Sequence, residues 1–145
     1  MGFTAIAVSG CFQPSPPEVV LQSYSISKVT LEGVEINFNF EIKNPNPIPM
    51  DVKTYDYRVY INDIEFLNEN RSGFSLSASD KKIVIIPVFI RYEKLLGTAA
   101  SIFNTINSGG QTIDYRIEGS VIGSVVGITI SAPIKTSGTI QIPQQ

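Results

Sequence analysis

The chain has 145 residues, of which 43% are hydrophobic and 17% charged, and its formal net charge is −2. This length supports one domain with a substantial core, and the hydrophobic content excludes a disordered hydrophilic chain. The weak negative charge argues against a nucleic-acid partner, which requires a basic surface. The sequence has no histidine and one cysteine, so the commonest general base is missing and neither an internal disulfide nor a thiolate zinc cluster is possible.

The first residues suggest a lipoprotein-like N-terminus. Met1–Gly10 is small and apolar, and Val8–Cys11 resembles the lipobox of bacterial lipoproteins, in which the cysteine is acylated after signal cleavage. No basic residue precedes the apolar run, and the run is short for a signal peptide. A start codon assigned too late would explain both departures; the alternative is a buried Cys11 near a frayed end. No stretch has the ~20 apolar residues that a membrane span requires.

A linker and a first strand follow. Phe12–Pro17 contains three prolines, which favour a semi-rigid extended spacer, so residues 1–17 form a separate N-terminal segment. Glu18–Thr30 alternates imperfectly between apolar and polar residues. A bulge near Gln22–Ser25 would restore a strand with one apolar face. Gly33 is then expected to make the turn into the next strand.

The most regular strand of the chain is Val34–Lys43. Its apolar and polar residues alternate without a break, so that one face of the strand is buried and the other is wet. It ends at Asn44-Pro45-Asn46-Pro47, where the prolines cannot donate to a β-ladder and the asparagines can hold a turn through their side chains. This loop is interpreted either as a rigid terminator that fixes how two strands cross or as a recognition loop on a rigid scaffold.

The remainder alternates with period two, except for one segment. The expected strands are Val52–Ile61, Ile64–Asn68, Phe74–Ser79, Ile83–Tyr92, Thr112–Val121, Val125–Ile134 and Thr139–Ile142. Turns between them are predicted at Asn62-Asp63, Asn70–Gly73, Asp80–Lys82, Gly123 and Lys135–Gly138, all in the style of hairpins. Ile83–Tyr92 is so apolar that burial on both faces is expected, with Pro87 at an edge or a bulge. Glu93–Asn107 has apolar residues at three- and four-residue spacing, which predicts an amphipathic helix.

These elements predict an all-β fold with one α-helix. Seven or eight strands without regular strand–helix alternation favour a two-layer antiparallel β-sandwich over a parallel sheet. No phosphate-binding glycine loop, nucleophile elbow or metalloprotease motif occurs, and the carboxylates fall on polar strand faces among basic residues. The sequence therefore predicts a protein that is not an enzyme, with no catalytic residues, cofactor or metal site.

Several features together resemble the LEA type 2 (late embryogenesis abundant group 2) family, whose domain is also called WHy, for water stress and hypersensitive response. They are the strand ending in Asn44–Pro47, the segment with the Asn62-Asp63 turn, the proline-containing strand before one helix, and the closing sequence SAPIKTSGTIQIP. The resemblance covers about Pro17 to Pro143, so that residues 18–143 are the expected domain. It implies an immunoglobulin-like or fibronectin type III-like sandwich of about seven strands, and an association with desiccation and other stress.

The resemblance also implies a location. Prokaryotic members of the family are often lipoproteins with a cysteine shortly before a proline-containing leader, the layout of Cys11 and Phe12–Pro17. The first hypothesis is a lipid-anchored protein of the cell envelope that protects membranes or proteins during water loss; retention of Met1 would instead leave it in the cytoplasm. The second is an envelope module that holds an unknown protein partner through an edge strand or the Asn-Pro-Asn loop. The third is a carrier with a pocket beneath the predicted helix.

Overall fold

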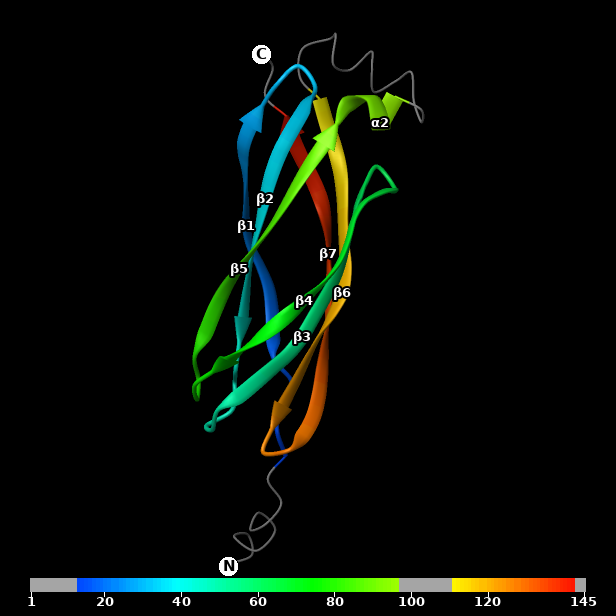
Figure 1. The fold of residues 1–145 in the computed structure, drawn as a ribbon. Helices are drawn as coiled ribbons and strands as arrows, with labels where there is room; N and C mark the ends of the chain where they lie inside the picture. The colour runs from blue at the N-terminus through cyan, green and yellow to red at the C-terminus, as the bar shows by residue number, and fades with distance from the viewer. Residues whose placement is uncertain (1–12, 97–110, 143–145) are drawn as a thin grey trace, which may run out of the picture.

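The computed structural model describes residues 13–96 and 111–142. Within these residues the elements are β1 (Glu18–Val29), β2 (Gly33–Lys43), β3 (Met50–Ile61), β4 (Ile64–Leu76), β5 (Lys81–Arg91), α2 (Tyr92–Leu96), β6 (Gln111–Val125) and β7 (Ile128–Ile142). Figure 1 shows long strands that run along one axis of the molecule in two layers.

The strands form two antiparallel sheets, one of order β1-β2-β5 and one of order β4-β3-β6-β7. The predicted antiparallel sandwich of about seven strands is therefore confirmed. The expectation of hairpins throughout is wrong, because the chain passes from one sheet to the other between β2 and β3, between β4 and β5, and between β5 and β6. These crossings place β2 at the centre of the smaller sheet and β3 and β6 at the centre of the larger one.

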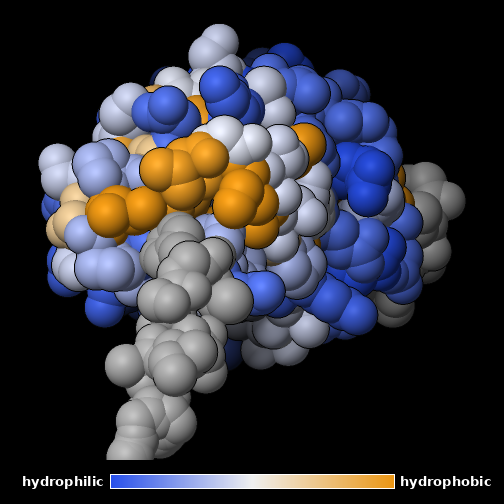
Figure 2. All heavy atoms as spheres, turned by 90° about the horizontal axis from the view of Figure 1, so that it is seen from below, coloured by the Kyte–Doolittle hydropathy of each residue, from blue (hydrophilic) through white to orange (hydrophobic). Residues whose placement is uncertain are grey.

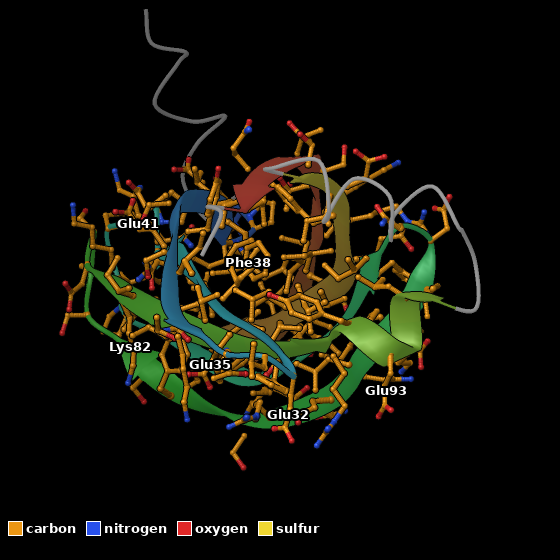
Figure 3. All side chains as sticks on the ribbon, turned by 90° about the horizontal axis from the view of Figure 1, so that it is seen from above. Glu32, Glu35, Phe38, Glu41, Lys82 and Glu93 are labelled. Atoms are coloured by element: carbon orange, nitrogen blue, oxygen red, sulfur yellow. The ribbon has the colours of Figure 1, made fainter. Side chains whose placement is uncertain are left out.

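Strand β2 shows why the alternating sequence forms a sandwich. Its apolar residues from Val34 to Ile42 are buried, whereas the polar residues between them are partly exposed. Figure 3 looks down the strands and shows Phe38 between the two sheets, with Glu41 and Lys82 at the outside. A side chain of this size contributes roughly 1.5–3 kcal/mol when it is fully buried, so a shift of register by one residue would be very unfavourable.

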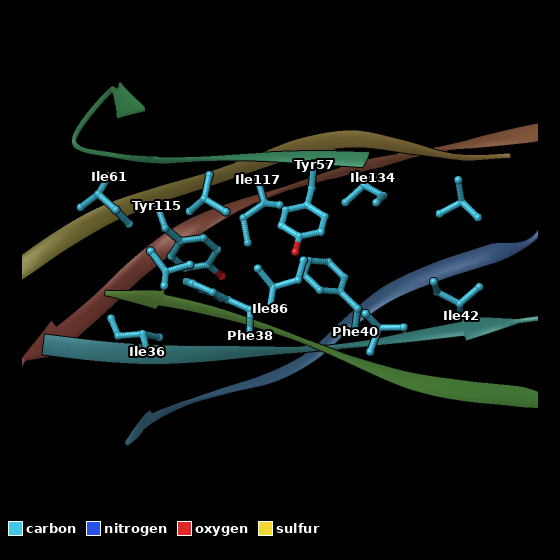
Figure 4. Close-up of a cluster of buried hydrophobic side chains, with 14 of the residues drawn as sticks. Ile36, Phe38, Phe40, Ile42, Tyr57, Ile61, Ile86, Tyr115, Ile117 and Ile134 are labelled. Carbon is cyan, nitrogen blue, oxygen red and sulfur yellow. The ribbon is translucent and has the colours of Figure 1, made fainter. Parts of the chain in front are cut away.

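The core fills the space between the two sheets. Figure 4 shows side chains of β2 and β5 meeting those of β3, β6 and β7. Phe38 and Tyr115 lie at the middle, with ring centroids 5.2 Å apart, and Tyr24 on β1 is 6.2 Å from Tyr115. Aromatic pairs in such tilted arrangements add about 0.5–1.5 kcal/mol to the effect of burial. The contact between β1 and β6 helps to hold the two sheets together.

Three predicted turns are wrong, and glycine accounts for each. Asn70–Gly73 lies inside β4, where a side chain on Gly73 would come within 1.6 Å of the Val52 carbonyl oxygen. Gly123 lies inside β6 opposite Ile130, and Gly138 lies inside β7 against the Tyr115 ring. Glycine in these strands allows close packing rather than a change of direction. The reversal predicted at Gly123 occurs instead at Val126-Gly127, between β6 and β7.

Two other turn-related predictions are confirmed. Asn62 and Asp63 have φ angles of 50° and 66° and join β3 to β4, as expected for a two-residue hairpin turn. The pairing of β1 with β2 shifts between Leu21 and Ser23, inside the segment where a bulge was predicted, and shifts again between Ile26 and Lys28.

Strand β5 is not buried on both faces, contrary to the prediction. Its residues alternate, with Val84, Ile86, Val88 and Ile90 inside and Ile83, Ile85 and Phe89 exposed. The reason is that none of the described elements covers the outer face of the smaller sheet (Figure 3). Pro87 pairs with Asn37 in an unbroken register, so the edge placement that its missing N–H predicted is confirmed.

The predicted helix Glu93–Asn107 can be compared only at its start. Helix α2 covers Tyr92–Leu96, with Leu95 buried in the core. The remainder of the predicted helix, and most of the pocket proposed beneath it, lie outside the described residues. No described helix is long and apolar enough to cross a membrane.

Candidate functional site

The Asn-Pro-Asn-Pro loop joins β2 to β3 where the chain crosses between the sheets. Asn44 and Asn46 are 0% and 2% exposed, and they are the buried polar side chains of the described part of the chain. Pro47 and Pro49 lie at the surface. Because a buried amide is costly unless it is hydrogen-bonded, the partners of the two asparagines decide what the loop does.

The side-chain oxygen and nitrogen of Asn44 both make hydrogen bonds. Its side-chain Nδ2 donates to the carbonyl oxygens of Ile48 at 2.9 Å and Ser77 at 3.0 Å. Its Oδ1 accepts from the backbone N–H of Asn46 at 3.0 Å and from Asn46 Nδ2 at 2.9 Å. Its own backbone N–H donates to the carbonyl oxygen of Asp80 at 2.8 Å. Asn44 thereby ties its own loop to the connection between β4 and β5.

Asn46 binds the segment that precedes β1. Its Oδ1 accepts from the Ser15 N–H at 2.7 Å, and its Nδ2 donates to the Ser15 carbonyl oxygen at 2.9 Å. Its backbone carbonyl oxygen accepts from the Ser79 N–H at 3.1 Å. Asn44 and Asn46 therefore join three segments at one end of the sandwich, and we call this arrangement the asparagine clamp.

The clamp leaves little for a ligand to bind. The side-chain oxygens and Nδ2 groups of both asparagines already have protein partners, and Pro45 and Pro47 have no N–H to offer. The geometry therefore favours the structural interpretation of Asn44, Pro45, Asn46 and Pro47 over the recognition loop. The other predicted site residue, Cys11, lies outside the described residues.

A shallow pocket of about 310 Å³ lies elsewhere, where the turn between β3 and β4 meets β6 and β7. Arg116 crosses it, with Nη1 2.9 Å from Asp63 Oδ1 and Nε 3.1 Å from Glu118 Oε2. The Arg116 guanidinium also lies 4.2 Å from the centre of the Tyr60 ring. The Arg116 charge is thus paired with two carboxylates, although its buried Nε makes no hydrogen bond. Asp114, Ser137 and Thr139 also line the pocket.

Three tyrosines among the described residues have raised pKa values. Burial, with the carboxylate of Glu69 3.2 Å from its hydroxyl, raises the pKa of Tyr57 to about 12. Burial also raises the pKa values of Tyr92 and Tyr115. Each tyrosine is thereby kept neutral, which suits a packed core rather than proton transfer. No group of three acidic or sulfur ligands that could hold a metal ion occurs among the described residues.

Sequence reasoning identified the clamp loop but not its partners. Ser15 and Ser77 lie 31 and 33 residues away from the asparagines they contact, and nothing local marks either serine as a partner. The available signal was indirect. Two asparagine side chains at the end of a half-buried strand must either be exposed to water or make hydrogen bonds within the protein. The three neighbouring prolines have no N–H, so fewer hydrogen-bond donors are available within the loop.

The two sheets and the clamp define a small β-sandwich whose crossing loop is held by buried asparagines. A family model described as late embryogenesis abundant protein, LEA type 2, matches residues 39–138, which is more than half of the chain. The chain therefore belongs to the LEA type 2 family, a stress- and desiccation-related family whose members are generally not enzymes. No curated protein sequence matches this chain.

Solved structures agree on the fold. A protein described as late embryogenesis abundant has a TM-score of 0.65 and 21% identity, over 88% of this chain and 72% of its own. A protein from Arabidopsis thaliana has a TM-score of 0.63 and 20% identity, over 95% of this chain and 89% of its own. A protein from Archaeoglobus fulgidus has a TM-score of 0.53 and 13% identity, over 90% of this chain and 100% of its own.

Proposed function

We propose that this protein is a non-catalytic LEA type 2 domain held on the outer side of a cell membrane by acylation of Cys11, where it stabilises membranes or proteins during water loss. The family relationship supports the association with stress. The absence of histidine from the sequence and the satisfied hydrogen bonds of the clamp support a role without catalysis.

The observation that carries the anchoring proposal is the bond between the lead-in and the clamp. Ser15, four residues after Cys11, makes both of its backbone hydrogen bonds to the buried side chain of Asn46. A short, proline-rich tether that starts at the clamp would hold the sandwich close to the bilayer and limit its orientations. A long flexible linker would not do so. This arrangement is useful for a protein that acts at a surface.

Intact-mass spectrometry of the native protein from separated membrane and soluble fractions tests the anchor. We expect a membrane-bound species that begins at Cys11 and carries added acyl mass, and we expect Cys11→Ser to move the protein to the soluble fraction. A soluble species that retains Met1 would contradict the anchor and leave a cytoplasmic stress-related sandwich.

Survival after drying tests the protective role separately. Deletion of the gene should lower survival of desiccation, and the wild-type chain should restore it fully. Cys11→Ser should restore it only in part if the membrane is the place of action. Unchanged survival on deletion, together with no induction by stress, would contradict the protective role.

A second function, a module that holds a protein partner, is favoured by one observation. Strand β5 lies at a sheet edge and exposes Ile83, Ile85 and Phe89 in a row. An added strand could pair with this edge and place its own apolar side chains beside these three. Capture of a stoichiometric partner from envelope extracts, lost in Ile85→Lys and retained in the opposite-edge variant Val20→Lys, would support this function. Capture of no partner would count against it.

A further inference from the structure

The hairpin between β6 and β7 lies at the same end of the sandwich as the clamp. Ser124, near the end of β6, pairs with Asp51, and Asp51 follows the clamp loop at the start of β3. Val125 pairs with Ile128 across the turn. Figure 1 shows this hairpin at the end where β1 begins. The lead-in to β1 and the hairpin therefore leave the domain in the same direction.

The residue at the tip of this hairpin is unusual for its conformation. Val126 has a φ of 42° and Gly127 a φ of 80°. Two-residue turns of this kind favour asparagine, aspartate and glycine, and the corresponding turn of the domain uses Asn62 and Asp63. A β-branched residue in this region of φ is strained. Because Val126 is also 71% exposed, core packing does not compensate for the strain.

The hairpin that carries Val126 has an exposed apolar tip and no charged residue of its own, and Asp51 on the neighbouring strand β3 pairs with Ser124. Ile128 on the other side of the turn is 44% exposed, and the sequence contains no charged residue from Gly119 to Ile134. The polar residues in this run are three serines and one threonine. Figure 2 looks onto this end of the sandwich and shows apolar residues gathered there. A hairpin of this composition could enter the interface of a bilayer without removing a charge from water.

We propose that the hairpin tip, Val126–Ile128, inserts into the lipid interface and orients the domain on the membrane. The inference rests on the proposed function, in that the domain acts at a membrane. The occupant is lipid because Ser15, which binds the clamp at this same end, lies four residues after Cys11, the residue that the proposed function anchors in the bilayer. A strained, exposed valine is then retained for the contact with lipid rather than for the fold.

The natural absence of tryptophan allows a direct test. In the full chain carrying Cys11→Ser, Ile128→Trp places one reporter at the hairpin tip. Leu31→Trp places a matched reporter at the opposite end, in the turn between β1 and β2, where Leu31 is 91% exposed. With phosphatidylcholine vesicles, we expect a blue shift and quenching by doxyl-labelled lipid for the tip reporter and neither for the control. Equal responses of the two reporters would overturn the proposal.

The substitution Val126→Asn separates lipid contact from folding. It places a favoured turn residue at a φ of 42°, so the thermal midpoint should rise. Sedimentation with phosphatidylcholine vesicles should fall roughly three- to tenfold, because an exposed apolar side chain is lost. Leu31→Asn should change vesicle binding by less than about twofold. A higher midpoint with unchanged binding would overturn the proposal.

Two further outcomes separate this inference from the anchor. If native Cys11 is acylated and the tip reporter does not respond to vesicles, the anchor stands and the tip proposal fails. If the tip reporter responds and native Cys11 is unmodified, the tip proposal stands and the anchor fails. A blue shift without vesicles that grows with protein concentration would show that the tip contacts a second copy, which also overturns the proposal. Adding phosphatidylglycerol should change the binding little, because the tip carries no charge.

Discussion

Replacement of Asn44 by alanine removes the centre of the clamp. The side chain is fully buried and takes part in four hydrogen bonds, donating to the carbonyl oxygens of Ile48 and Ser77 and accepting from two N–H groups of Asn46. Alanine makes none of these bonds. The two carbonyl groups and the two N–H groups then lose their partner at a position that is 0% exposed in the native fold.

The expected loss follows from this count. A typical hydrogen bond contributes a net 0.5–1.5 kcal/mol or so, and a buried group without a partner costs about 1–3 kcal/mol. Movement of the loop would allow water to reach some of the four abandoned groups. We therefore expect Asn44→Ala to lower the free energy of unfolding by about 3–5 kcal/mol, a large fraction of the ~5–15 kcal/mol that stabilises a typical domain.

Urea denaturation followed by far-ultraviolet circular dichroism measures this change. Asn39→Ala provides the matched control, because Asn39 lies on the outer face of β2 and makes one exposed hydrogen bond to Ser23, of 3.0 Å. The control substitution should lower the free energy of unfolding by less than about 1 kcal/mol. If the losses for Asn44→Ala and Asn39→Ala agree to within about 1 kcal/mol, the clamp does not hold the crossing of the sheets and the reasoning is refuted.

Three further predictions concern the sheets and the core. Gly119→Ala on β6 should lower the free energy of unfolding by about 3 kcal/mol or more, because the new methyl group would lie 2.0 Å from the Asp56 carbonyl oxygen. Gly123→Ala on the same strand should cost less than about 1 kcal/mol, since it meets the flexible Met50 side chain at 3.2 Å; equal losses in the urea assay would contradict the packing argument. Burial and Glu69 raise the pKa of Tyr57 from 10.0 to about 12, so its contribution to stability is complete below pH 10 and is lost as the pH rises to about 12. This loss should be about 2–3 kcal/mol by titration of urea midpoints and should be absent from Tyr57→Phe, whereas the same pH dependence in both proteins would assign it to other groups.

The alternation of apolar and polar residues identified β2, β3 and β6 because it depends on local geometry alone. Successive side chains of a strand point to opposite faces, and the pattern survives in any fold that buries one face. The turn at Asn62-Asp63 was predictable for a similar reason. Its two residues have positive φ angles that asparagine and aspartate tolerate, and no distant contact is required.

Glycine gave wrong turn predictions because it is found both in chain reversals and in strands that pack closely against a neighbour. Gly73 and Gly123 suggested turns, yet both lie in paired strands. At Gly73 the close approach of the β3 backbone requires glycine, whereas Gly123 faces the Met50 side chain, and only the neighbouring strand distinguishes either case from a reversal. The reversal between β6 and β7 contains Gly127, but the preceding Val126 fits the pattern of a strand. The turn was therefore not predicted there.

The sequence by itself determined the fold class, the interior face of the central strands and the loop that closes β2. Tertiary structure alone decided which segments meet. Ser15 and Ser77 reach the asparagine clamp from 31 and 33 residues away, and a local pattern carries no record of such a contact. It also decided that Ile85 on β5 is 57% exposed, since a strand as apolar as β5 is buried on both faces only if another layer covers it. The burial of a residue depends on how all the strands pack together, whereas the alternation of apolar and polar residues depends on each strand's own sequence.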